Sequence, residues 1–485
     1  MEEAQTDVKR EYKDNIITSQ HTVNIQGKEY SYTATVGTIV LKKEESEKSP
    51  QSKGEFFFMA YTLNDVEDYG KRPITISFNG GPGSSSVWLH LGVLGPRRVV
   101  SETTTEEGVQ LISPPYSLIN NDYSILDKTD LCFIDPISTG FSRPVEGEKE
   151  NQFHGYDEDI QWVAEFIRMY ITRYNRWLSP KFLIGESYGT TRAGGLSGYL
   201  QERLGIYLNG IMLVSSILDF QTTNFNVSND MPYICFFPSF VATAWYHKMI
   251  SSDLQNDLQS TLRKAESFAL NEYSVALLKG DRLTDEDKNK IAVTINEFTG
   301  LPVELILQNH LRIPAHTFFR EFLRSDGKSI GRLDSRYTLL QRNQEGFAFF
   351  SDPSYIAIQG PYTATFNDYV RRELKYETDL PYEILISLSS KWNYSKFQNN
   401  YVNSAETLAD AMTKNPYLKV IICNGYYDLA TPYFGTEFSI NHMKLDRNIM
   451  QNITMKYYEA GHMMYIHQES LEKQRKDLVD FLDNC

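Results

Sequence analysis

Short, strongly apolar runs recur along the chain, and each is followed closely by glycine, proline or aspartate. Runs of this length and composition are typical of strands that are buried on both faces of a parallel sheet. They occupy residues 74–78, 131–134, 182–184, 211–214 and 420–423, with a more mixed run at 454–458. Helix-like stretches separate several of them, most clearly over residues 157–173. This alternation predicts an α/β fold, in which a mainly parallel sheet has helices on both faces.

Two parts of the chain depart from this alternation. Residues 28–41 and 55–63 have strand-like patterns and predict an antiparallel pair, joined by a charged, exposed loop over 42–53. The long interval between Asp219 and about Leu380 is helical, polar and aromatic, and so long a break in a sheet protein predicts an insertion. We therefore expect a flexible tail over 1–20, a core over 21–221 and 379–485, and a mostly helical cap over 222–378.

The composition of the 485 residues excludes several classes of protein. Hydrophobic residues make up 41%, which is enough to bury a large core and too many for a mainly disordered or fibrous chain. The net charge of −14 argues against nucleic acid as a partner, because phosphate backbones bind clusters of Lys and Arg. No apolar run reaches the roughly 18 residues of a membrane span. The nearest run, residues 232–246, is interrupted by Pro238 and predicts a buried segment.

The four cysteines, at positions 132, 235, 423 and 485, favour a reduced protein. They are too few for a disulfide scaffold and have no spacing that suits zinc. We expect three buried thiols, one thiol at the tail, and no metal or other cofactor. The charged N-terminus lacks the apolar segment of a signal peptide. These features predict a cytoplasmic protein, although secretion from a trimmed precursor would leave the same sequence.

The segment GESYG, residues 185–189, has the pattern G-x-S-x-G. An apolar strand precedes it, and a helix rich in small residues follows it. A nucleophilic serine on a tight strand-to-helix turn requires this context, because bulky neighbours would clash there. The pattern alone is weak evidence, so its position between strand and helix is what nominates Ser187 as a nucleophile.

A serine hydroxyl needs a base to take its proton and a carboxylate to orient that base. Two later loops offer these groups in the order Ser, Asp, His that is found in α/β-hydrolases. Asp428 lies in the turn NGYYDLATP after one apolar run, and His462 lies in the turn EAGHMMY after the next. His467 lies nearby, but we expect it to begin the last helix. Ser187, Asp428 and His462 are the predicted catalytic triad.

A glycine-rich loop, NGGPGSSS over residues 79–86, follows the apolar run at 74–78. It has neither of the glycine patterns that bind nucleotide phosphates. In a hydrolase, such an early loop supplies one backbone N–H to the oxyanion hole, and the residue after the nucleophile supplies the other. This role nominates Gly81 and Tyr188.

Together, NGGPGSSS, GESYG, the aspartate loop and GHM near the C-terminus resemble the serine carboxypeptidase family of α/β-hydrolases, in order from about residue 74 to the end. The resemblance implies an α/β-hydrolase fold and the triad and oxyanion donors nominated above. It also implies that Asn79, Gly80 and Glu186 hold the C-terminal carboxylate of a peptide. Met463 is then placed to line the pocket of the leaving amino acid. Two carboxyl groups bind each other only by sharing a proton, which favours action in acid.

The chain departs from secreted relatives at several positions. Ser77 and Ser84 stand where those relatives usually have Trp and Cys, and Val93 stands where they have a second Glu. Either Arg97 or Arg98 could replace that Glu as a positive partner for the carboxylate, or both could be solvated. The missing cysteines suit a bacterial-type, reduced member of the family.

We predict a serine carboxypeptidase that forms an acyl-enzyme on Ser187 and acts on peptides with a free C-terminus. An esterase or acyltransferase on the same scaffold is the alternative, because fold does not fix function. A catalytically inactive binding protein is a third hypothesis. We expect the loop 137–142 to keep one wall of the site, and the aromatic segment 233–245 either to wall the cleft or to pack in a core. We expect no membrane or nucleic-acid partner and leave a homodimer open.

Overall fold

The apolar runs form the centre of one large sheet. The computed structural model describes residues 11–45, 48–105, 108–341 and 351–485. Its main sheet has ten strands, in the order β1-β2-β3-β9-β4-β11-β12-β15-β16, with β10 paired to β3. Neighbouring strands from β9 to β16 are parallel, whereas the pairs β1–β2, β2–β3 and β3–β9 are antiparallel. The strands are β1 (Asn15–Ile25), β2 (Lys28–Glu45), β3 (Lys48–Leu63), β4 (Ile74–Phe78), β9 (Asp130–Ile134), β10 (Arg143–Pro144), β11 (Lys181–Ser187), β12 (Gly210–Ser216), β15 (Lys419–Gly425) and β16 (Ile453–Tyr458).

The N-terminal strands are longer than their sequence pattern predicts. β1 begins at Asn15, inside the tail that was expected over residues 1–20. β2 ends at Glu45 and β3 begins at Lys48, so most of the charged stretch 42–53 is paired strand. The expectation of a long loop there is wrong. β1 lies at the edge of the sheet, and most of its residues are exposed or half-buried. An edge strand that is largely exposed needs few apolar residues, which explains the many polar residues in the sequence of β1.

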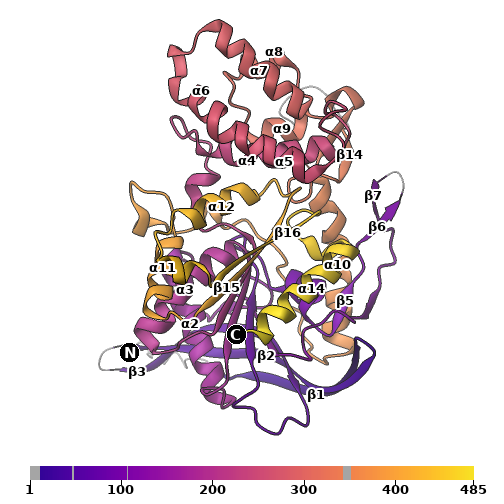
Figure 1. Cartoon of the computed structure of the whole chain (residues 1–485). Helices are drawn as coiled ribbons and strands as arrows, with labels where there is room; N and C mark the ends of the chain where they lie inside the picture. Colours follow the sequence, from indigo (N-terminus) through magenta and orange to yellow (C-terminus); the bar gives the residue numbers. More distant parts are fainter. Residues whose placement is uncertain (1–10, 46–47, 106–107, 342–350) are drawn as a thin grey trace, which may run out of the picture.

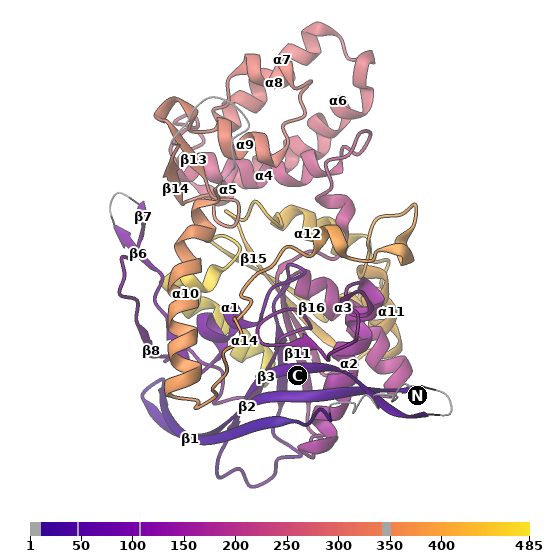
Figure 2. The same ribbon diagram turned by 180° about the vertical axis from the view of Figure 1, so that it is seen from behind.

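Helices cover both faces of the sheet, and each face has its own hydrophobic core. The helices on one face are α2 (Tyr156–Arg173), α3 (Tyr188–Leu204) and α11 (Ala405–Lys414). Those on the other face are α1 (Val87–Leu89), α10 (Pro353–Arg372) and α14 (Gln468–Asp483). Figures 1 and 2 show the two sets on opposite sides of the strands, with α12 (Tyr433–Asn441) near one end of the sheet. This is the α/β architecture that the alternating pattern predicts.

A helical lobe follows β12 and stands beyond one end of the sheet (Figure 1). Its helices are α4 (Met231–Tyr246), α5 (Leu258–Phe268), α6 (Ser274–Lys279), α7 (Asp285–Thr299), α8 (Val303–Gln308) and α9 (Ala315–Glu321). The apolar run 232–246 lies in α4, at the centre of a separate core. α10 falls within the range expected for the cap, yet its apolar residues pack in a core of the main sheet. We call α4–α9 and the following residues up to 352 the cap.

The remaining strands form three small hairpins. They are β5 (Arg97–Val99) with β8 (Leu118–Asn120), β6 (Glu102–Thr105) with β7 (Gly108–Leu111), and β13 (Lys328–Ile330) with β14 (Thr338–Leu340). Cys132, Cys235 and Cys423 are buried and Cys485 is exposed, as expected. None of the helices in the described part of the chain combines the length and the apolar character needed to cross a membrane.

Candidate active site

Ser187 lies at the turn between β11 and α3. Its backbone has φ 59° and ψ −128°, a strained conformation for a residue that carries a Cβ. The flanking glycines permit the turn. A Cβ on Gly185 would lie 2.2 Å from the carbonyl oxygen of Gly189, and a Cβ on Gly189 would lie 2.8 Å from that of Phe78. The strand, strained serine and helix that the sequence predicts are therefore present.

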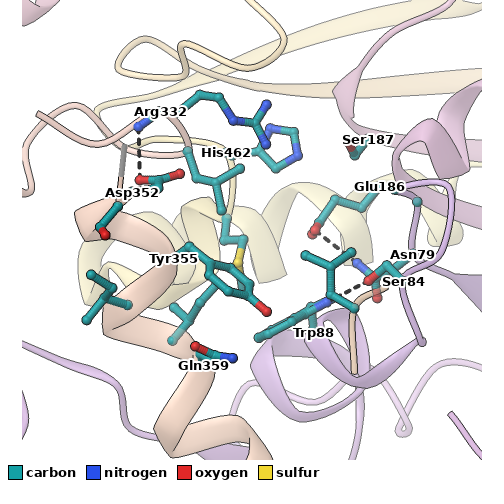
Figure 3. Close-up of a pocket in the computed structure, with 18 of the residues that line it drawn as sticks. Asn79, Ser84, Trp88, Glu186, Ser187, Arg332, Asp352, Tyr355, Gln359 and His462 are labelled. Carbon is teal, nitrogen blue, oxygen red and sulfur yellow. Dashed lines mark hydrogen bonds between the residues drawn. The ribbon is translucent and has the colours of Figure 1, made fainter. Parts of the chain in front are cut away.

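Asp428 and His462 lie in the loops that follow β15 and β16, and they are hydrogen-bonded to each other. His462 Nδ1 is 2.7 Å from Asp428 Oδ2. Asp428 is fully buried, and its Oδ1 accepts hydrogen bonds from the backbone N–H groups of Ala430 and Thr431 at 2.7 and 3.0 Å. Ser187 and His462 line the same cavity (Figure 3). The fold thus brings the three predicted triad residues to one place.

The surroundings of His462 stabilise its positive charge. Burial opposes the charged imidazolium, but the negative charge and hydrogen bond of Asp428 outweigh it, so the pKa of His462 is raised. Glu186 raises this pKa further, and the guanidinium of Arg332 lowers it. A base with a raised pKa is a stronger acceptor for the proton of a serine hydroxyl.

The glycine-rich loop lies directly against the serine turn. A Cβ on Gly80 would lie 2.4 Å from the backbone nitrogen of Tyr188, so only glycine allows this approach. Tyr188 is the first residue of α3, and its N–H therefore has no partner within the helix. Gly81 lines the cavity beside Ser187. The loop and the start of the helix are placed to offer the two N–H groups of an oxyanion hole.

Glu186 and Asn79 form a hydrogen-bonded pair in the cavity (Figure 3). Asn79 Nδ2 donates to Glu186 Oε1 at 2.9 Å, and the Tyr465 hydroxyl donates to Oε2 at 2.5 Å. Asn79 Oδ1 accepts from the backbone N–H of Leu89 at 3.1 Å, which fixes the orientation of the amide. Burial raises the pKa of Glu186 to about 7, although His462 and the two donors favour its charged form. Near neutral pH this carboxyl can hold a proton to share with a bound carboxylate.

The cavity has a volume of about 840 Å³ and lies between the core and the cap. On the core side, it is lined by residues of the 79–88 segment, by Glu186 and Ser187, and by His462 and Met463. On the other side it is lined by α9, by Arg332 and Leu333, and by the first part of α10. Among the described residues, no group of three or more His, Cys, Asp and Glu side chains is arranged to hold a metal ion.

Two segments that were expected to wall the cavity lie elsewhere. The aromatic segment 233–245 packs in the core of the cap, so of the two readings left open, core packing is the right one. None of the residues 137–142, all of which are described, lines the cavity, and Phe141 packs in a core of the main sheet. The cap instead reaches the site through α9 and the residues before α10, which carry no motif.

Neither Arg97 nor Arg98 reaches the carboxylate pair. Arg97 donates to both carboxylate oxygens of Glu373, at 3.0 and 2.5 Å, and neither arginine is among the described residues that line the cavity. Of the two alternatives left open for these arginines, the structure does not support replacement of the second Glu. Val93 is fully buried in a core, so nothing acidic faces the cavity from that position. Ser84, at the position of the absent cysteine, accepts a 2.7 Å hydrogen bond from Trp88 Nε1.

The sequence reasoning missed three residues that support the site. The Thr431 hydroxyl donates to Asp428 Oδ2 at 2.7 Å, and the Ser215 hydroxyl donates to the carbonyl oxygen of His462 at 2.6 Å. Both lie at or just beyond the carboxyl end of a strand, a position that could have nominated them. Tyr465 lies three residues beyond His462, but no sequence pattern pairs it with Glu186.

The chain is similar to known serine carboxypeptidases. A family model described as serine carboxypeptidase matches residues 46–474. The pheromone-processing carboxypeptidase KEX1 of Saccharomyces cerevisiae is 35% identical over 161 residues, which cover 31% of this chain and 20% of the yeast protein. Serine carboxypeptidase-like 33 of Arabidopsis thaliana is 26% identical over 210 residues, 41% of this chain and 38% of the plant protein.

A solved structure extends the similarity in fold over almost the whole chain. It is that of a prohormone-processing carboxypeptidase from Saccharomyces cerevisiae, with a TM-score of 0.55 and 20% identity, and it covers 94% of this chain and 91% of that one. The sequence match, by contrast, spans only a fifth of the length of the yeast relative.

Proposed function

Because the chain belongs to the serine carboxypeptidase family, we propose that it releases C-terminal amino acids from peptides through an acyl-enzyme on Ser187. The observation that carries this proposal is the pair of Glu186 and Asn79, which lies beside the nucleophile in one cavity. An enzyme that only hydrolysed esters would have no use for a protonated carboxyl there. A free C-terminus supplies the carboxylate with which that proton is shared.

The reaction begins when the Ser187 hydroxyl attacks the last peptide carbonyl and His462 takes its proton. Asp428 holds the imidazole through Nδ1 and stabilises the imidazolium. The N–H groups of Gly81 and Tyr188 stabilise the oxyanion, each lowering the barrier by about 3 kcal/mol. His462 then gives the proton to the leaving amine, and the amino acid departs. Water, activated by the same base, attacks the acyl-enzyme and frees the shortened peptide.

The terminal carboxylate is held by groups on the core side of the cavity. Protonated Glu186 donates to it, and the Asn79 amide and the backbone N–H of Gly80, which line the same cavity, complete the set. Met463 lines the pocket of the leaving residue. Binding in this way fixes the scissile bond one residue from the C-terminus, which is the defining restriction of a carboxypeptidase.

The direct test is release of the C-terminal amino acid from an N-blocked dipeptide between pH 4 and 8. The C-terminal amide of the same dipeptide and a simple aryl ester serve as comparison substrates, and Ser187→Ala as the inactive control. Release from the free acid that is much slower from the amide, and absent in the variant, would support the proposal. Turnover of the ester alone would favour an esterase or acyltransferase, and failure to react with a fluorophosphonate would favour an inactive binding protein.

A further inference from the structure

Two arginines line the cap side of the cavity. They are Arg320 of α9, which lies 3.3 Å from Glu321, and Arg332. The acidic side chain on this side is Asp352, whose Oδ1 already accepts from the backbone N–H groups of Arg332 and Ser354. The protein as a whole has a net charge of −14, so an arginine that faces this cavity without an acidic partner is a candidate for contact with a ligand.

The backbone at Arg332 is held on both sides. Its N–H donates to Asp352 Oδ1 at 3.1 Å, and its carbonyl oxygen accepts from Leu429 N–H at 3.1 Å. At the next residue, the N–H of Leu333 donates to a serine hydroxyl at 3.0 Å, and its carbonyl oxygen accepts from His462 N–H at 2.6 Å. Arg332 is thus fixed against the loops of the triad by its main chain, while its side chain is left for another role.

The side chain of Arg332 extends from the cap toward the imidazole of His462 (Figure 3). Arg332 is exposed, and within the described ranges of the chain its guanidinium makes no hydrogen bond or ion pair with a protein group. Buried arginines near the site are paired, for instance Arg336 with Asp334 at 2.6 Å and Arg192 with Asp159 at 2.6 Å. A guanidinium that faces a cavity without a partner is available to a carboxylate of the ligand.

The position of the leaving residue follows from the proposed function, on which this inference rests. Its amine must lie within reach of His462, and its carboxylate must lie at Asn79 and Glu186. Its side chain then projects away from the core, toward Met463 and the cap. Arg332 lies on that side of the cavity, beside the histidine (Figure 3).

We propose that Arg332 selects peptides whose C-terminal residue is Asp or Glu, by binding the side-chain carboxylate of the leaving amino acid. A planar guanidinium can make two parallel hydrogen bonds to such a group. The acidic side chain meets Arg332 while the main-chain carboxylate meets protonated Glu186, so the two carboxylates of the leaving residue have separate partners.

The test compares kcat/KM for N-blocked dipeptides that differ only in a C-terminal Glu, Gln or Lys. For the wild type we expect Glu to exceed Gln by about tenfold or more, as for a hydrogen bond between charged groups, and Lys to be poorest. In Arg332→Gln the ratio of Glu to Gln should fall to about one. The ratio is the readout, because loss of this guanidinium also removes its effect on the pKa of His462 and so changes the rate on both substrates. Arg332→Glu should instead prefer Lys. Arg447→Gln, an exposed arginine remote from the cavity, is the matched control and should keep the wild-type ratio.

The outcomes separate this inference from the proposed function. If the wild type releases none of the three residues, the carboxypeptidase proposal itself fails. If it releases Gln and Glu equally well, or if Arg332→Gln keeps the preference for Glu, the role of Arg332 is wrong while the activity stands. An equal loss on both substrates in Arg332→Gln would also overturn it, since selection must change the ratio. Labelling by a fluorophosphonate shows that each variant is folded.

Discussion

The carbonyl oxygen of Leu333, in the cap, accepts a 2.6 Å hydrogen bond from the backbone N–H of His462, in the core. A second hydrogen bond joins the cap to the loop of Asp428. The carbonyl oxygen of Arg332 accepts it from the backbone N–H of Leu429, the residue after Asp428. The cap therefore does more than cover the cavity. Its segment before β14 is hydrogen-bonded to both loops of the predicted charge pair, so displacement of the cap would disturb their spacing.

Asp334 extends this contact into a buried ion pair. Its Oδ2 accepts from the Gly461 N–H at 3.0 Å and from Arg336 at 2.6 Å, and both side chains are 3% exposed. Asp334→Asn leaves the Arg336 charge buried without its partner, so we expect a loss of about 3–5 kcal/mol in the free energy of unfolding. Because the hydrogen bond next to His462 weakens too, kcat should also fall. Urea denaturation together with steady-state kinetics would measure both effects.

The matched control for this variant is Asp253→Asn, an exposed aspartate in the cap. It should change the free energy of unfolding by less than about 0.5 kcal/mol. A loss below 1 kcal/mol in Asp334→Asn with an unchanged kcat would show that the cap contact does not position the histidine loop.

Asp428→Asn tests the orientation of the base. An amide can present its NH₂ group to Nδ1 and so favour the wrong tautomer of His462, and it stabilises the imidazolium poorly. We expect kcat to fall by about 10⁴-fold with little change in KM, as in serine proteases with the corresponding change. The Thr431 hydroxyl donates to Asp428 Oδ2, the oxygen that also holds His462. Thr431→Val removes this donor but keeps the carboxylate, so it should lower kcat far less than Asp428→Asn. A fall of less than tenfold in Asp428→Asn would remove this aspartate from the triad.

The sheet and the triad could be predicted because short segments of the sequence carry the residues that each of them requires. A strand buried on both faces must be apolar throughout, and β4, β9, β11, β12 and β15 each contain such a run. A strained serine turn needs glycines on both sides, and these stand at Gly185 and Gly189. Loops at the carboxyl ends of parallel strands meet at one edge, so Asp428 and His462 were expected to converge.

The cap side of the site could not be predicted because it depends on contacts between segments that are far apart in the sequence. Arg332 and Leu333 follow no periodic pattern, and their approach to His462 is set by how the cap docks on the core. Arg97 and Arg98 closely follow Val93, the position of the missing second Glu, which suggested a role in the cavity. Arg97 pairs instead with Glu373, 276 residues away along the chain. Sequence proximity does not show which way a loop turns.

Tyr465→Phe should shift the alkaline limit of the reaction. The Tyr465 hydroxyl donates to Glu186 and so favours its charged form, which holds the pKa near 7 against the effect of burial. Without this donor the pKa of Glu186 rises, and the protonated form persists to higher pH. We expect the fall in kcat/KM on free-acid dipeptides to move upward in pH, with no such change on an aryl ester. A downward shift, or the same shift on both substrates, would contradict a shared proton at Glu186.

Glu186→Gln should make the unfolding free energy less dependent on pH. Burial raises the pKa of Glu186 from 4.5 to about 7, so the folded protein binds a proton that the unfolded chain has released between these values. Binding of this proton adds on the order of 3 kcal/mol to the free energy of unfolding below pH 4.5, and this contribution is lost as the pH rises through 7. Glutamine has the same shape and does not titrate, so the variant should gain stability relative to wild type between pH 5 and 8. Urea denaturation at pH 5, 6, 7 and 8 measures the difference.

Asp135 and Glu102 also have pKa values raised to about 7 by burial and remain in both proteins, so some dependence on pH should persist. Parallel curves for the two proteins would show that Glu186 is ionised throughout this range, and that it cannot share a proton with a substrate carboxylate.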